Sequence, residues 1–196
     1  MESELMATAG KHGVTTSTPQ NIFFGAGTVH FGLKYEGSSW NFDETLVGAT
    51  KEGTTVSIVP EFYEVEPDGA LVSVKNLTKK IGETATLKIN FLEISEELIQ
   101  KALIAEAGTS ADTNYKKIVS KASIEEGDYV DVGVVGETFD GELCIVILKN
   151  ALCVSGLELD KKNKEASTTT LEFKCHADCS GDLDTLPWEI YYPNRA

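Results

Sequence analysis

The segment from Thr84 to Leu92 alternates apolar and polar side chains, and this period of two constrains the fold more than any other feature of the sequence. Leu87, Ile89 and Phe91 share one face of an extended chain, and polar residues occupy the other face. Such alternation is typical of an antiparallel strand with one face buried and the other in water. The sequence therefore predicts a half-buried antiparallel strand here.

Similar short patterns recur along the chain and are separated by turn-forming residues such as Pro67-Asp68-Gly69. Regularly spaced strands with turn signals are typical of an antiparallel β-sandwich or a partly closed barrel. We therefore expect a mainly β fold. The other expected strands include residues 28–33, 54–59, 61–66, 71–74, 127–135, 142–149 and 167–175.

One segment breaks the strand pattern and predicts a single flanking α-helix at about residues 95–107. Ser95 can cap the helix, and acidic residues in its first turn suit the helix dipole. Ile94 and Ile99 occupy the hydrophobic positions on either side of the cap. Gly108 is a natural stop.

Residues 34–53 are mixed in character, and we predict a long loop or a hairpin there. Loops of this length in compact domains are usually functional or disordered, and the aromatic residues Trp40 and Phe42 argue against disorder. The two aromatic side chains could mark a partner surface, or they could form a local cluster packed under the loop. The sequence leaves both alternatives open.

Length and composition predict one domain at residues 21–196, preceded by a flexible N-terminal arm at residues 1–20 that is rich in small and hydroxyl residues. No signal peptide and no apolar stretch of membrane-spanning length is visible, so we expect a cytoplasmic protein with reduced cysteines. The 31 acidic and 17 basic residues give a net charge of −14. This balance argues against tight binding of nucleic acid or anionic membranes.

Catalytic motifs are missing: the sequence has no phosphate-binding glycine loop, no nucleophile elbow and no paired-histidine zinc helix. The one candidate metal group is Cys175, His176 and Cys179, which Cys144 and Cys153 could complete. Its spacing argues against zinc, because Cys175 falls on the core face of a predicted strand. We therefore predict no enzyme, no catalytic residue, no metal and no cofactor, with zinc at this group as an open alternative.

Five segments occur in a recognisable order: Gly25–Gly27 before a strand, Leu46–Gly53 before an alternating strand, Val65–Ala70, Leu87–Leu103 and a C-terminal run from Asn150 to Ile190. In this order and spacing the chain resembles the major tail tube proteins of long-tailed bacteriophages and prophages of Gram-positive bacteria. The resemblance covers about residues 21–193. Glu52 and Pro67 depart from the family pattern as variations within turns.

The resemblance implies a structural virion protein that assembles into stacked hexameric rings and forms the tail tube, a conduit for DNA ejection. In that family the inner sheets of neighbouring subunits join into one barrel, and a long loop reaches the next ring. The implied partners are other copies of the chain, tape-measure, distal tail and tail-terminator proteins, and phage DNA that passes without specific binding. The implied location is the virion tail, assembled in the host bacterial cytoplasm.

Two sets of residues are candidates for roles in such a tube. The long loop would stack the rings, and acidic residues would face the lumen. The candidate inter-ring contacts are Trp40, Phe42, Leu46 and Lys51, and the candidate lumen-facing charges are Glu61, Glu64 and Glu66.

Other readings of the sequence stay open. A free-standing β-sandwich that binds carbohydrate or protein would be monomeric, and a small metal-dependent enzyme would hold zinc near Cys175 and His176. Within the tube hypothesis, the sequence does not separate a flexible tail, a contractile tail and a phage-like bacteriocin.

Overall fold

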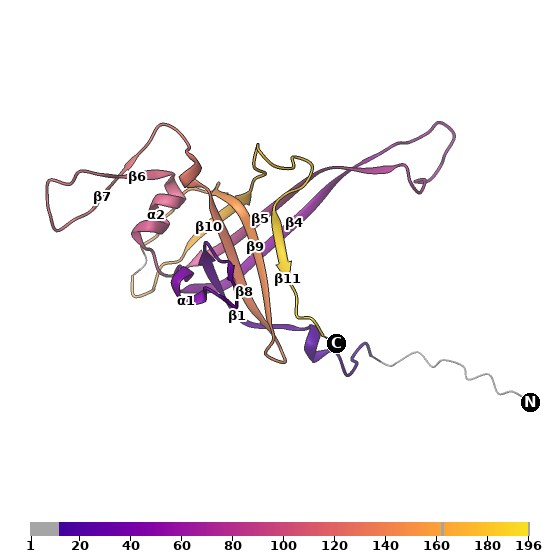
Figure 1. Ribbon diagram of the computed structural model, residues 1–196, viewed down its shortest axis with the longest axis horizontal. Coiled ribbons are helices and arrows are strands. Elements are labelled where there is room, and N and C mark those ends of the chain that lie inside the picture. Colours follow the sequence, from indigo (N-terminus) through magenta and orange to yellow (C-terminus); the bar gives the residue numbers. More distant parts are fainter. Residues whose placement is uncertain (1–11, 162, 196) are drawn as a thin grey trace, which may run out of the picture.

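A computed structural model describes residues 12–161 and 163–195 of the protein. The predicted N-terminal arm therefore lies outside the described residues up to residue 11, and residues 12–20 are largely exposed and lead into the 3-10 helix η1 (Pro19–Asn21). The largest sheet of the described residues is antiparallel, in the order β1-β8-β9-β10-β5-β4, with β11 paired to β9 (Figure 1). The predicted mainly antiparallel β fold is confirmed.

The sheet consists of seven strands that differ widely in length. They are β1 (Phe23–Phe31), β4 (Thr50–Glu64), β5 (Thr78–Phe91), β8 (Val130–Thr138), β9 (Leu143–Cys153), β10 (Thr169–Cys175) and β11 (Trp188–Tyr191).

Two short hairpins and three short helices complete the described elements. They are β2 (Tyr35–Glu36) with β3 (Ser39–Trp40), β6 (Ala105–Gly108) with β7 (Lys117–Ser120), α1 (Phe42–Thr45), α2 (Glu96–Leu103) and the 3-10 helix η2 (Glu126–Asp128).

The sheet curls into a partly closed barrel because the segment before β4 reaches across to β1. Leu46 forms an isolated bridge with His30, and the Val47 amide donates to the Val29 carbonyl at 3.0 Å. This seam satisfies backbone groups that an open edge would leave unpaired.

The barrel core is built from the alternation of β5. Leu87, Ile89 and Phe91 are buried, as their spacing predicts, and they pack with Leu171 and Phe173 of the neighbouring strand β10. The polar residues between them stay on the outer face, so this sheet has one apolar face and one hydrated face.

Helix α2 packs Leu98 and Ala102 into the same core. Its predicted cap is present, since the Leu98 amide donates to Ser95 Oγ at 3.1 Å. The helix ends at residue 103 instead of about residue 107, because Ile104 turns left-handed with φ 51° and the next four residues form β6. No helix in residues 12–161 and 163–195 is long and apolar enough to cross a membrane.

Residues 34–53 differ from the predicted long loop. They form the β2–β3 hairpin, helix α1 and the first residues of β4. Trp40 and Phe42 pack against the outer face of β8 and β9, where they cover Val135, Ile145 and Ile147. The β2–β3 hairpin matches the predicted alternative of a hairpin, whereas helix α1 was not predicted, because short elements that are stabilised by packing carry little periodicity of their own.

Candidate assembly surface

The β4–β5 hairpin continues far beyond the barrel as a two-stranded projection, here called the arm, residues 59–82 (Figure 1). Strand β10 pairs with β5 only between Thr86 and Phe91. In the part of the chain that the structure describes, no strand pairs with either outer edge of the arm. An isolated two-stranded ribbon is only marginally stable in water, so the arm is a surface suited to a partner.

The arm carries large apolar side chains that remain exposed among the residues that the structure describes. Phe62 and Ile81 are each 62% exposed, and Leu71 at the tip is 97% exposed. Phe62 lies opposite Lys80 and Tyr63 opposite Lys79, so the two aromatic rings point to opposite faces of the ribbon. Apolar groups gathered in this way on an extended element are typical of an interaction surface.

The three candidate lumen-facing residues lie on or next to the arm. Glu61 and Glu66 are exposed and Glu64 is half-buried. Glu61 is opposite Gly82, and its carboxylate occupies the space that a side chain at that glycine would need. Glu61 and Glu64 lie on β4 and Glu66 lies two residues beyond its end, so the three are close in the chain, and their orientation toward a lumen stays a prediction.

The four candidate inter-ring residues do not form one patch. Trp40 stacks on Phe42 with ring centroids 6.3 Å apart and meets the Tyr191 ring edge-on at 4.8 Å. These contacts match the alternative of a local cluster packed under the loop. Leu46, 54% exposed at the barrel seam, and Lys51, exposed at the start of β4, remain accessible to a partner.

The C-terminal segment, residues 186–195, acts as a strap between the base of the arm and the far end of the barrel. Trp188 Nε1 donates to the Glu83 carboxylate, which also pairs with Lys80. These contacts lower the pKa of Glu83, and the hydrogen bond from Lys80 has the largest effect. Farther along, Glu189 forms an ion pair with Lys149 of β9. The strap therefore holds the arm base against the barrel.

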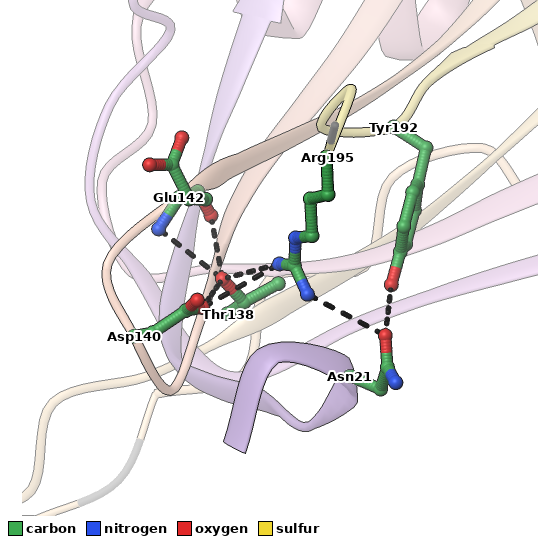
Figure 2. A network of polar contacts seen from close by, with 6 residues as sticks. All are labelled: Asn21, Thr138, Asp140, Glu142, Tyr192 and Arg195. Atoms are coloured by element: carbon green, nitrogen blue, oxygen red, sulfur yellow. Dashed lines mark hydrogen bonds and ion pairs between the residues drawn. The ribbon is translucent and has the colours of Figure 1, made fainter. Parts of the chain in front are cut away.

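The strap ends in a polar clamp, shown in Figure 2. Arg195 lies 3.5 Å from the Asp140 carboxylate in the β8–β9 turn and donates to Asn21 Oδ1 at 3.5 Å. The Tyr192 hydroxyl donates to the same Asn21 oxygen at 2.9 Å. These contacts join η1, the β8–β9 turn and the strap at one end of the barrel.

The cysteine and histidine residues considered for zinc do not converge. Cys175 is buried and donates from Sγ to the Lys149 carbonyl at 3.1 Å, and burial raises the pKa of its thiol to about 11. Cys179 is exposed, while the His176 ring contacts Tyr129. Among residues 12–161 and 163–195, no group of three or more His, Cys, Asp or Glu side chains is placed to hold a metal ion.

The length of the arm is the functional feature that the sequence analysis missed. Residues 54–59 and 61–66 both have strand character on either side of Pro60, and together they are much longer than a typical strand. That run is the sequence signal for a hairpin whose strands extend beyond the barrel sheet. The expected return strand at residues 71–74 is absent, and β5 begins only at Thr78.

Comparisons with known proteins give little further information. No family model matches the chain, and no curated protein matches it. Among solved structures, the chain is similar to a chain in the cryo-EM structure of the anti-feeding prophage (AFP) baseplate, 6-fold symmetrised, with 11% identity and a TM-score of 0.40. The similarity covers 84% of this chain and 92% of that chain. A TM-score this low is insufficient to assign a shared fold, so nothing further follows from it.

Proposed function

We propose that this chain is the repeating subunit of a phage-type tail tube, a structural protein that assembles with copies of itself into stacked hexameric rings and does not catalyse a reaction. The rings enclose a conduit through which DNA passes without specific binding. In a virion the tube meets tape-measure, distal tail and tail-terminator proteins.

The observation that carries this proposal is the arm. A ribbon with two unpaired edges and exposed apolar side chains on both faces is a weak structure by itself, and copies of the same chain supply the missing neighbours. A contact between two different surfaces of identical chains closes into rings or propagates as filaments. The exposed residues Leu46 and Lys51 are candidates for a second contact between rings.

Assembly is tested on the full chain by light scattering after size exclusion and by negative-stain microscopy across a range of concentrations. Rings or tubes are the expected result. A chain that stays monomeric at every concentration and in every assembly condition contradicts the proposal and favours the monomeric binding module. A phage-like bacteriocin would use the same tube, and the presence or absence of DNA ejection separates it from a virus.

A shortened arm sharpens this test. In the variant, an Asn-Gly turn replaces residues 62–80, which leaves the barrel strands intact. We expect a folded monomer that forms no rings. The matched control removes residues 110–114 from the β6–β7 hairpin, a second projection with a polar tip, and should assemble normally. Tubes formed by the arm variant would rule out the role of the arm.

A further inference from the structure

The two limbs of the arm carry opposite charge. The outgoing limb, residues 59–66, holds Glu61, Glu64 and Glu66 and no basic residue. The returning limb, residues 75–82, holds Lys75, Lys79 and Lys80 and no acidic residue. Glu61 and Glu64 lie on β4 and Lys79 and Lys80 on β5, while Glu66 and Lys75 lie in the connection just beyond the strands. Among the described residues, no strand pairs with the outer edge of either strand of the arm.

Most of these charges have no ion-pair partner within the described residues. Lys80 pairs with Glu83 at the arm base, and Glu61 lies over Gly82. In the described ranges, no ion pair forms at Glu64, Glu66, Lys75 or Lys79. The net charge of the two limbs is thus available to a neighbouring chain.

Edge pairing between two arms can occur in two ways. If both arms point in the same direction, β4 of one copy lies beside β5 of the next and runs antiparallel to it, so an acidic limb meets a basic limb. A two-fold arrangement instead brings β4 beside β4 or β5 beside β5. Like charges on adjacent strands destabilise such a pair, whereas opposite charges stabilise it.

We propose that the arms of neighbouring copies pair edge to edge, the acidic β4 limb of one copy against the basic β5 limb of the next. This inference rests on the proposed function and specifies its contact. The charge pattern selects the head-to-tail contact, which repeats around a ring, over the two-fold contact, which stops at a dimer. The partner surface is therefore a second copy of the same arm, recognised by charge and by its free backbone groups.

Charge reversal tests this pairing without touching Lys80 or Glu61. One variant carries Lys75→Glu and Lys79→Glu, so that both limbs are acidic at the changed positions. A second variant carries Glu64→Lys and Glu66→Lys, which makes both limbs basic. A third variant combines all four substitutions and has the same net charge as the original chain. Each is followed by light scattering and negative-stain microscopy.

Neither of the first two variants should assemble alone, and an equimolar mixture of them should form rings, because every acidic arm then lies between two basic arms. The variant with all four substitutions should assemble alone, since its two limbs still carry opposite charge. Rescue by mixing excludes simple misfolding of the arm. If the original chain assembles and either of the two double-substitution variants also assembles alone, the inference is wrong and the proposed function stands. If the original chain never assembles, both are wrong.

Discussion

The two halves of the β4–β5 hairpin belong to the same pair of strands and have opposite surroundings. Near the barrel, β5 has β4 on one side and β10 on the other, and its inward side chains are buried. In the arm, β5 keeps only β4, and the corresponding side chains are in water. The near half is stabilised within one chain, whereas the far half is complete only with a partner.

Leu87 and Ile81 test this contrast most directly, because both lie on β5, Leu87 in the barrel and Ile81 in the arm. Leu87 is 1% exposed, so Leu87→Ala removes buried contacts and leaves a cavity. We expect a loss of about 2–5 kcal/mol in the free energy of unfolding, measured by urea denaturation of the monomer. A loss below about 1 kcal/mol would show that packing in the barrel core does not stabilise the barrel half of the β4–β5 hairpin.

Trp188 joins the two halves, since its indole donates to Glu83 where the arm leaves the barrel. Trp188→Phe keeps most of the ring and removes this hydrogen bond to a charged group. Unfolding curves should show a loss of about 1–3 kcal/mol. Tyr191→Phe is the matched control, because the Tyr191 hydroxyl donates to Glu189, whose side chain is 36% exposed against 9% for Glu83, and should contribute less. If both variants lower the free energy of unfolding equally, the hydrogen bond from Trp188 to Glu83 does not anchor the arm.

His30 closes the barrel seam, the feature that the arm lacks. Its ring nitrogens lie 2.8 Å from Thr28 Oγ1 and 3.0 Å from Thr45 Oγ1, and burial lowers its pKa. The unfolded chain therefore takes up a proton more readily, so stability is full above about pH 6.5 and falls as the pH drops below it. His30→Gln should flatten the decline between pH 7 and pH 5. An identical pH dependence in both proteins would exclude this histidine as its source.

Ile81→Ala gives the smallest expected change in monomer stability. Ile81 is 62% exposed, so its truncation should alter the free energy of unfolding by less than about 0.5 kcal/mol. The same change should reduce assembly, because the lost contact is one that a neighbouring arm would make. Loss of monomer stability comparable to that of Leu87→Ala would mean that the arm packs within its own chain.

The same contrast explains what the sequence could predict. The alternation of Leu87, Ile89 and Phe91 predicted a buried strand face, and Ser95 predicted the start of α2, because both signals depend on neighbours close in the chain or on the core. Tyr63 and Val65 alternate with Glu64 and Glu66 in a comparable strand pattern, and both are exposed. Alternation indicates that a face is to be covered, and it contains no information on whether the cover belongs to the same molecule.

Trp40 and Phe42 show a second limit of sequence patterns. Trp40 and Phe42 were assigned to a contact between rings from their residue type and from the apparent loop around them. In the structure they cover the outer face of β8 and β9, a contact with residues about 100 positions farther along the chain. Sequence patterns do not register such distant packing.

The clamp at the end of the strap has a consequence for synthesis of the protein. Arg195 and Asn21 are 174 positions apart, so β1 emerges from the ribosome long before the residue that fastens its neighbouring helix η1. Contacts between such distant positions form late during folding. In a nascent chain, this end of the barrel would therefore lack its clamp until Arg195 has emerged from the ribosome.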